Sequence, residues 1–454
     1  MKVHFIAIGG SVMHQLAIAL KRKGYEVSGS DDEIFEPALT ALSNEGILPA
    51  ETGWFPNKLV KRPDAVILGM HAKADNPEIK QAKELGLTIY SFPEYIFQES
   101  KNKQRVVVGG SHGKTTTTAM IMHVLKAGNK EFDYLVGARL QGFDQSVQIS
   151  NAPLIVCEGD EYPASVLEKR PKFHFLYPHV AILTGIAWDH INVFPTFDFY
   201  LSQFLIFIER IETGGILIYN ESDEELNKLV TGNRRDDIRY QPYSVPEHSI
   251  ENGITTVMLG GHEGSLRVFG NHNLLNLTAA YYACAESGIS ASDFLLHIKN
   301  FTGASKRLEL LAEKPGTAVF RDFAHAPSKL KATIDAVKQQ YPQRRLVAVF
   351  ELHTFSSLSE AFMNEYSGAM DKADDALVYY SKHALELKRL PDLDHQVIAA
   401  GFGKSNLIVM NQREQLENFL LSVPADDTCV LLMSSGNYDG LDMLTFARKM
   451  LSQS

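Results

Sequence analysis

The sequence has few cysteines, and they are widely separated. Cys157, Cys284 and Cys429 are the only three in 454 residues, and each lies in an apolar or helical stretch. This spacing favours reduced thiols in a core over disulfides or metal ligands. The usage is typical of a cytoplasmic protein.

Long apolar runs and clusters of positive charge are also missing. No apolar stretch approaches the roughly 18 residues that a membrane-spanning helix needs, and the first residues follow a strand pattern rather than that of a signal peptide. The formal net charge is −10, with no Lys/Arg block, so nothing supports nucleic-acid binding. We therefore expect a cytoplasmic protein with small-molecule partners, without nucleic acid or membrane among them.

The chain does have the length and apolar content for several cores. With 454 residues, of which 45% are apolar, a prior of roughly 150 residues per domain suggests about three domains. Short apolar runs alternate with helical patterns throughout, which predicts the α/β class with mostly parallel sheets. Polar or glycine-containing connectors place the domains at residues 1–104, 105–302 and 303–454.

The clearest motif follows the apolar run at residues 105–108 and reads Gly109-Gly110-Ser111-His112-Gly113-Lys114-Thr115-Thr116. Glycines let backbone N–H groups converge on phosphate oxygens, Lys114 can reach the β- and γ-phosphates, and the Thr115 hydroxyl can hold magnesium. A strict Walker A motif would have glycine in place of Val108. A glycine-rich turn that binds nothing is the alternative, but the preceding strand and the Thr-rich helix start favour a phosphate loop.

Acidic residues follow the next predicted buried strand, at residues 154–157. Glu158-Gly159-Asp160-Glu161 stands at its carboxyl end, which is where ligands bind in open α/β sheets. A carboxylate there can coordinate magnesium or hold its water shell, whereas a solvated acidic turn is the alternative. A further strand at residues 180–184 leads to Asp189-His190, and a lone histidine in such a place is usually structural.

The N-terminal stretch predicts a strand, a glycine turn and a helix. The apolar run at residues 3–8 ends at Gly9-Gly10, and a second strand ends at Asp31, near the distance at which an acidic residue meets a ribose hydroxyl in dinucleotide folds. Ala7 and Val12 occupy the first and last glycine positions of Gly-x-Gly-x-x-Gly. On its own, the turn is equally well interpreted as structural.

Together these stretches resemble the Mur ligases, the ATP-dependent enzymes that build the peptidoglycan peptide. The short loop Gly110-Ser111-His112-Gly113-Lys114-Thr115 is similar to theirs, and two more motifs follow in the family's order: Gly270-Asn271-His272-Asn273-Leu274-Leu275-Asn276 and Asp322-Phe323-Ala324-His325-Ala326-Pro327. The resemblance covers essentially the whole chain. It implies a Rossmann-like N-terminal domain, a central P-loop ATPase-type domain and a C-terminal Rossmann-like domain that binds the acceptor.

The resemblance also implies roles for particular residues. The UDP-sugar is expected at Gly9, Gly10, Ser11, Val12, Met13 and Asp31. ATP is expected at Gly110, Ser111, His112, Gly113, Lys114, Thr115, Thr116, His272, Asn276, Arg307 and Asp322. Magnesium, or manganese in its place, is expected at Thr115, Glu158 and His190, and the catalytic group comprises Lys114, Glu158, His190, Asp322 and His325.

Some positions depart from the family. Gly185 stands where Asn is usual and Ala187 where Glu is frequent, so the metal site is expected to be supported differently. The helix at residues 200–207 has no lysine, which fits the branch that does without a carbamylated one.

The implied reaction joins the carboxylate of UDP-N-acetylmuramate to an amine through an acyl phosphate. Val12, residues 162–173 and the loop at 434–440 favour the tripeptide L-alanyl-γ-D-glutamyl-meso-diaminopimelate as acceptor, in peptidoglycan recycling; L-alanine, in peptidoglycan biosynthesis, is the alternative. Thr354 replaces an arginine of the L-alanine enzyme, so no acceptor contacts are predicted. A sensor that binds UDP-sugar and ATP without ligating them is the alternative of another class.

Overall fold

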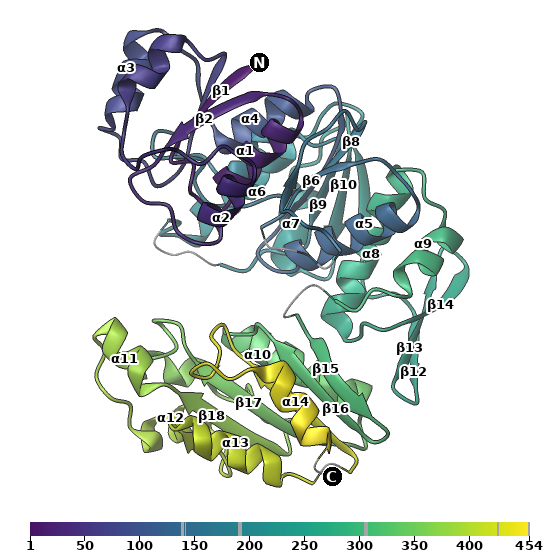
Figure 1. Ribbon diagram of the computed structural model, residues 1–454. Helices are drawn as coiled ribbons and strands as arrows, with labels where there is room; N and C mark the ends of the chain where they lie inside the picture. The colour runs from purple at the N-terminus through teal and green to yellow at the C-terminus, as the bar shows by residue number, and fades with distance from the viewer. Residues whose placement is uncertain (138–139, 141, 189–192, 304–306, 425, 453–454) are drawn as a thin grey trace. The chain divides into compact units, whose positions relative to one another are not determined.

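The computed structural model describes residues 1–454 except 138–139, 141, 189–192, 304–306, 425 and 453–454. The chain divides into two compact units, which are Met1–Val245 with Leu275–Ile298, and Pro246–Leu274 with Lys299–Ser454. Figure 1 labels their elements. None of the described helices is long and apolar enough to cross a membrane.

The first sheet of the first unit is parallel, in the order β2-β1-β3-β4. Its strands are β1 (Lys2–Ile6), β2 (Glu26–Ser30), β3 (Ala65–Leu68) and β4 (Ile89–Ser91). Phe5 packs on one face with α1 (Met13–Arg22), α2 (Ala38–Asn44) and α4 (Phe92–Ser100), and Ile6 packs on the other with η1 (Pro56–Lys61) and α3 (Pro77–Glu84). Burial on both faces explains why the central strand β3 is continuously apolar.

The second sheet of the first unit has the order β11-β10-β9-β5-β8-β6-β7, and all its pairings are parallel except that of β6 with β7. Its strands are β5 (Gln104–Gly109), β6 (Asp133–Leu135), β7 (Val147–Gln148), β8 (Leu154–Glu158), β9 (Val180–Leu183), β10 (Ile216–Asn220) and β11 (Arg239–Tyr243). The helices that accompany it are α5 (Lys114–Ala127), η2 (Lys172–Phe175), α6 (Phe197–Glu209), α7 (Glu224–Gly232), α8 (Asn271–Glu286) and α9 (Ala291–Ile298). Helix α8 begins in the second unit and continues in the first.

The central strand β5 sets the position of the glycine loop. It pairs with β8 on one side and with β9 on the other, with Val108 opposite Glu158 and Gly109 opposite Leu183. The carboxyl ends of these three parallel strands therefore meet at one edge, which is where α/β sheets bind ligands.

The second unit contains a three-stranded antiparallel sheet and a six-stranded sheet. The strands of the first are β12 (His248–Glu251), β13 (Ile254–Leu259) and β14 (His262–Leu266). The second has the order β15-β16-β20-β17-β18-β19 and is parallel apart from β15. Its strands are β15 (Glu309–Lys314), β16 (Thr317–Asp322), β17 (Arg345–Leu352), β18 (Asp375–Tyr380), β19 (Ile408–Met410) and β20 (Thr428–Met433).

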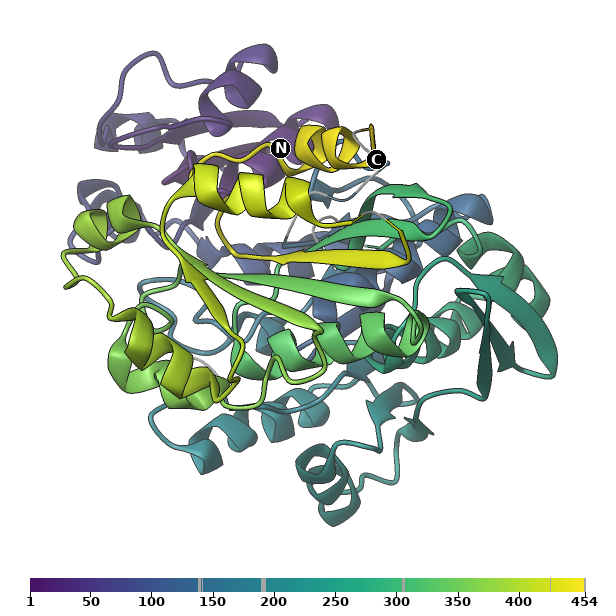
Figure 2. The ribbon, with the colours of Figure 1, turned by 90° about the horizontal axis from the view of Figure 1, so that it is seen from below.

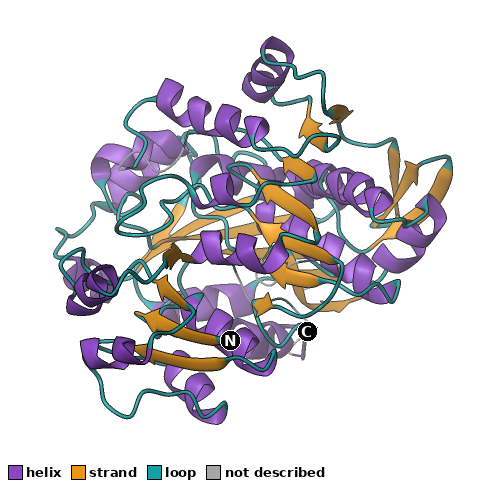
Figure 3. Ribbon diagram, turned by 90° about the horizontal axis from the view of Figure 1, so that it is seen from above, coloured by secondary structure: helices purple, strands orange, loops and turns teal. Residues whose placement is uncertain are grey.

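Helices cover both faces of the six-stranded sheet. Phe350 and its neighbours pack with α10 (Pro327–Gln340), η3 (Glu360–Tyr366), α11 (Lys382–Lys388) and α12 (His395–Phe402), whereas Val349 and its neighbours pack with α13 (Arg413–Ser422) and α14 (Met443–Ser452). Figure 2 shows the yellow and yellow-green α13 and α14 on one face and α10 on the other. In Figure 3 the orange strands are flanked by purple helices. The predicted α/β class with mostly parallel sheets is confirmed, and the domain boundaries at residues 104 and 302 stay predictions.

Candidate active site

The loop between β5 and α5 has a backbone that only glycine fits. Gly110 has a φ of 126° and Gly113 a φ of 81°, in the left-handed region that side chains rarely adopt. A Cβ at Gly110 would collide with the Thr184 hydroxyl, and one at Gly113 would collide with the Asn276 amide. The glycines therefore allow close packing of this loop.

Backbone atoms of the neighbouring segment hold the loop in shape. The Ser111 N–H donates to the Gly185 carbonyl over 2.9 Å, and the Ala187 N–H donates to the Ser111 hydroxyl over 2.9 Å. The Ser111 and Tyr200 hydroxyls also lie 2.8 Å apart, and the Thr184 hydroxyl donates to the His112 carbonyl. Because Gly185 and Ala187 act through their backbones, the side chains that the family usually has there are not needed for this support.

Lys114 forms an ion pair with a carboxylate that was not predicted as a site residue. Its ammonium donates to the Gly110 carbonyl over 2.5 Å and to the two Glu161 carboxylate oxygens over 2.8 and 3.1 Å. Glu161 is only 2% exposed. A phosphate bound at the loop would compete with Glu161 for this ammonium.

Two of the three predicted metal ligands lie together. The Thr115 hydroxyl donates to Glu158 over 2.7 Å, and the Gly137 N–H donates to the other oxygen of that carboxylate over 2.9 Å. The third, His190, lies outside the described residues, and the described residues contain no group of three or more His, Cys, Asp or Glu suited to a metal ion.

The donor atoms of this pair suit magnesium. A hydroxyl and a carboxylate beside a phosphate loop are hard oxygen ligands, and Mg²⁺ in nucleotide sites commonly uses few protein ligands together with phosphates and water. Thr115 and Glu158 would hold the ion, which when bound supplies charge neutralisation on the phosphates.

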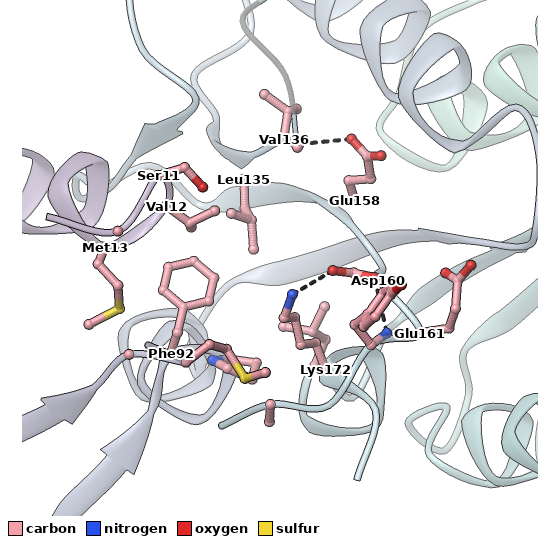
Figure 4. A pocket seen from close by; sticks show the side chains of 18 of the residues that line it. Ser11, Val12, Met13, Phe92, Leu135, Val136, Glu158, Asp160, Glu161 and Lys172 are labelled. Atoms are coloured by element: carbon pink, nitrogen blue, oxygen red, sulfur yellow. Dashed lines mark hydrogen bonds and ion pairs between the residues drawn. The ribbon is translucent and has the colours of Figure 1, made fainter. Parts of the chain in front are cut away.

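The turn predicted to bind the UDP-sugar, which is the donor substrate, and Lys114 of the phosphate loop line one cavity of about 510 Å³. Figure 4 shows apolar side chains, Val12, Met13, Phe92 and Leu135, in one part of its lining and the charged Glu158, Asp160, Glu161 and Lys172 in another. The remaining lining residues are Gly10, Ser11, Leu68, Gly69, Met70, His71, Pro93, Lys114, Val136, Gly137, Tyr162, Ala164 and Leu176. Four of the six residues predicted to bind the UDP-sugar thus line the same cavity as Lys114 and Glu158.

The other two residues predicted to bind the UDP-sugar, Gly9 and Asp31, are joined by a hydrogen bond. The Gly9 N–H donates to the Asp31 carboxylate over 2.7 Å, and Asp31 is 4% exposed. Burial raises the pKa of Asp31 to about 6, although the bond from Gly9 opposes this shift. Ala7, at the first glycine position, adopts a left-handed φ of 66°, so the turn forms there without glycine. The ribose contact of Asp31 stays a prediction.

Asn276 and His272 lie on α8 but belong to different units. In the first unit, the Asn276 amide oxygen accepts from the Thr117 hydroxyl over 3.2 Å and faces Gly113. In the second, burial lowers the pKa of His272 to about 4, and the charge of Arg307 adds to the shift. His272 is therefore neutral at pH 7.

Asp322 is buried in the second unit with partners of its own. Its carboxylate accepts from the Leu308 N–H over 2.5 Å and from the Ala324 N–H over 2.7 Å. Burial raises its pKa. The carboxylate thereby fixes the chain next to Arg307, the predicted ATP contact.

Two further predicted residues flank Phe323. The Arg307 guanidinium lies 5.2 Å from the centre of the Phe323 ring, and His325 Nδ1 lies 2.9 Å from the Phe323 carbonyl. The nucleotide contacts of Arg307, Asp322 and His325 stay predictions.

Sequence reasoning missed a second buried carboxylate, Glu351, at the end of β17. It is 2% exposed and accepts hydrogen bonds from the Ser434 hydroxyl and, over 3.0 Å, from the Tyr438 N–H. Burial raises its pKa. A Cβ at Gly436 would lie 2.6 Å from His353 Nδ1, so the loop at residues 434–440 packs closely here. Only the apolar strand preceding Glu351 pointed to this position.

The glycine loop, its lysine and the carboxylates at the ends of neighbouring parallel strands define an enzyme that uses a nucleoside triphosphate. Comparison with known proteins makes the class specific. Three family models match successive parts of the chain: "Mur ligase family, catalytic domain" over residues 2–103, "Mur ligase middle domain" over 108–284, and "Mur ligase, glutamate ligase domain" over 306–436. The chain belongs to the Mur ligase family, whose members are ATP-dependent amide-bond ligases, and it is such a ligase.

Individual relatives carry two different names. A UDP-N-acetylmuramate–L-alanine ligase of Clostridium kluyveri is 30% identical over 396 residues, which are 83% of this chain and 82% of that protein. A solved UDP-N-acetylmuramate:L-alanyl-gamma-D-glutamyl-meso-diaminopimelate ligase from Neisseria meningitides is 25% identical, with a TM-score of 0.60, and the match covers 66% of this chain and 98% of that one. UDP-N-acetylmuramate-alanine ligase MurC from Thermotoga maritima shares the fold, with a TM-score of 0.68, 23% identity and coverage of 100% and 99%.

Proposed function

We propose that the protein joins the lactyl carboxylate of UDP-N-acetylmuramate to the amine of L-alanyl-γ-D-glutamyl-meso-diaminopimelate, with ATP and Mg²⁺, in peptidoglycan recycling. One observation supports the part of this proposal that concerns UDP-N-acetylmuramate. The Gly10–Met13 turn and Lys114 line the same cavity. A UDP-sugar held at the turn can direct its carboxylate towards a γ-phosphate held at the glycine loop.

The chemistry follows from this juxtaposition. A carboxylate oxygen attacks the γ-phosphorus and ADP leaves; the amine then attacks the acyl carbon and phosphate leaves. Lys114 neutralises phosphate charge and the cavity aligns two reactants of like charge, which is where catalysis of phosphoryl transfer largely comes from.

Support for the tripeptide acceptor comes from particular stretches of the chain. Val12 and part of the 162–173 segment line the donor cavity, and the 434–440 loop packs around Glu351 in the second unit. These are the stretches that resemble the tripeptide-adding branch. The Neisseria enzyme, at 25% identity, adds to this support.

A second acceptor remains a candidate. L-Alanine is favoured by the name of the Clostridium kluyveri relative at 30% identity. The non-ligating sensor is not favoured, because the chain belongs to a family of amide-bond ligases and because Gly185 and Ala187 support the loop through their backbones.

The test is release of phosphate from ATP and UDP-N-acetylmuramate with each acceptor. We expect the tripeptide to react at least about tenfold faster than L-alanine, because about 1.4 kcal/mol of extra transition-state binding from the remote peptide suffices. Turnover of L-alanine with an inert tripeptide would reassign the acceptor. Tight binding of UDP-sugar and ATP without turnover with either acceptor would contradict both assignments of the acceptor.

A further inference from the structure

Lys172 provides a second ammonium group in the lining of the donor cavity, and the ATP and metal chemistry above does not use it. Its side chain is 26% exposed, and its Nζ lies 2.5 Å from Asp160 Oδ2. Figure 4 shows the two groups meeting in the part of the cavity that faces Phe92. Asp160 and Glu161 are consecutive, so neighbouring carboxylates hold the two lysines of this lining, Lys172 and Lys114.

The segment that carries Lys172 is built to fix its position. The Lys172 N–H donates to the Tyr162 carbonyl over 2.9 Å, and the Phe173 N–H donates to the Asp160 carbonyl over 3.1 Å. The Tyr162 N–H donates in turn to Asp160 Oδ1 over 3.0 Å. The Lys172 ammonium and the Asp160 carboxylate form an ion pair at 2.5 Å, so both ends of this segment are fixed at the cavity.

The proposed reaction needs a cation for each of its two anions. The donor carboxylate must approach the γ-phosphate, and two like charges at close range repel each other strongly in a cavity of low dielectric. Lys114 lies on the glycine loop and serves the phosphate. Glu158, Asp160 and Glu161, which also line the cavity, are carboxylates and would repel the donor, whereas Lys172 is the second lysine of the lining beside Lys114 and can attract it.

We infer that Lys172 binds the carboxylate of the donor sugar and places it for attack on the γ-phosphate, with Asp160 holding the ammonium in position. This inference rests on the proposed function. It assigns a substrate contact to a side chain that the sequence pattern did not mark as part of the site.

The test uses two sugars that differ in the lactyl group, which carries this carboxylate. UDP-N-acetylmuramate and UDP-N-acetylglucosamine, which lacks the lactyl group, are titrated calorimetrically without ATP into the full-length protein. Its variants are Lys172→Met, Lys172→Arg and Asp160→Asn, and the exposed Lys169→Met is the matched control.

We expect Lys172→Met to weaken binding of UDP-N-acetylmuramate at least tenfold and to change that of UDP-N-acetylglucosamine less than twofold. Lys172→Arg should keep most of the preference, Asp160→Asn should lose a smaller part, and Lys169→Met should lose none. Because Lys172→Met leaves Asp160 without its partner, melting temperatures are measured, and the double variant Lys172→Met/Asp160→Asn should show the same loss of preference.

Equal weakening for both sugars would overturn the inference, since Lys172 would then support the loop or the pyrophosphate. Unchanged binding of UDP-N-acetylmuramate by Lys172→Met would also overturn the inference. The proposed function would still stand in that case if the unaltered protein turned over its substrates. If the unaltered protein bound neither sugar, the proposed function would fail and the inference with it.

Discussion

At the scale of single residues, the pair of Lys114 and Glu161 links activity to stability. The sequence marks Lys114 as a phosphate ligand, and in the structure its partner Glu161 is 2% exposed and lies 47 positions away in the chain. Removing one member of a buried ion pair is strongly destabilising, because the buried charge that stays loses its partner's attraction. A lysine of catalytic interest is therefore also a structural one.

We predict that Lys114→Met abolishes phosphate release and also destabilises the protein by about 3 kcal/mol, the usual cost of breaking a buried ion pair by removing one member. Adding Glu161→Gln should restore most of the stability and none of the activity. Denaturant unfolding and turnover measure the two effects separately. The exposed Lys130→Met is the control, and a Lys114→Met protein as stable as the parent would show that the pair contributes nothing to the fold.

Asp31 gives stability a pH dependence with a definite sign. Burial raises its pKa to about 6 in the folded protein from 3.8, so the folded state favours the protonated form. Its contribution is most favourable below about pH 4, declines as pH rises towards 6, and stays unfavourable above that.

Asp31→Asn removes this penalty, so we expect the variant to be the more stable protein at pH 7. A shift of about two units sets an upper limit of about 3 kcal/mol on the gain. The difference should vanish as pH falls to about 4, whereas the exposed Glu33→Gln should show no such trend. Melting curves between pH 4 and 8 measure it, and a difference that stays constant with pH would contradict the account.

At the scale of elements, the strands and the glycine loop could be predicted because their signals are local. The buried parallel strands β3 and β9 are apolar throughout, and β5 and β8 contain the apolar runs 106–108 and 154–157, since both faces of each sheet are covered. Sheet β12-β13-β14 was not predicted. Its strands expose alternate residues, such as Ile254 and Met258 at 53% and 40%, so they lack the continuous apolar run.

The site could be predicted only in part, for a related reason. The glycines and Lys114 form a contiguous motif, whereas Asp160, Glu161 and Lys172 enter the cavity through the folding of the 160–173 segment. Nothing in the residue types at those positions marks their pairing with one another. Likewise, support of the loop by backbone atoms of residues 185 and 187 leaves no trace in side-chain identity.

Gly113 offers a direct test of the loop, with Gly214 as its matched control. Both have a φ of 81°, but a Cβ at Gly214 meets nothing within 4 Å, whereas one at Gly113 collides with Asn276. Gly214→Ala should cost about 1 kcal/mol of stability from the left-handed backbone alone and leave turnover unchanged.

For Gly113→Ala we expect at least the same loss of stability and a fall in turnover of about a hundredfold, because a shifted loop misplaces the phosphate. The double variant Gly113→Ala/Asn276→Ala should recover part of the stability by removing the collision. Equal turnover in the two single alanine variants would show that loop packing is not what Gly113 provides.

Gly185 and Ala187 differ in what a side chain would do there. Gly185 has a φ of 146°, and a Cβ on it would lie 2.8 Å from Asp223 Oδ2, the oxygen that accepts from the Ile186 N–H over 2.8 Å. Ala187 is exposed.

Replacing Gly185 and Ala187 by the residues that the family usually has should therefore give different results at the two positions. Gly185→Asn should lower the melting temperature by several degrees and reduce turnover, whereas Ala187→Glu should leave both nearly unchanged. Thermal unfolding and phosphate release measure these effects. A stable, fully active Gly185→Asn protein would show that the segment adjusts freely to a side chain.

At the scale of the whole molecule, both compact units place candidate site residues at the carboxyl ends of parallel strands, where α/β sheets commonly bind ligands. In the first unit this edge carries Lys114, Thr115 and Glu158, and in the second it carries Asp322, Glu351 and Ser434. The sequence motifs predicted membership of the Mur ligase family, and this membership explains why polar side chains stand at both sheet edges. The central claim is that a donor carboxylate in the first unit's cavity reacts with the γ-phosphate of ATP.

The most direct test of this claim follows an oxygen atom through the reaction. UDP-N-acetylmuramate labelled with ¹⁸O in its lactyl carboxylate is incubated with ATP, Mg²⁺ and the tripeptide, and the released phosphate is analysed by mass spectrometry. If the carboxylate attacks the γ-phosphorus and the amine then expels phosphate from the acyl carbon, each phosphate carries one ¹⁸O from the sugar. Release of unlabelled phosphate, as from attack by water, would contradict the account.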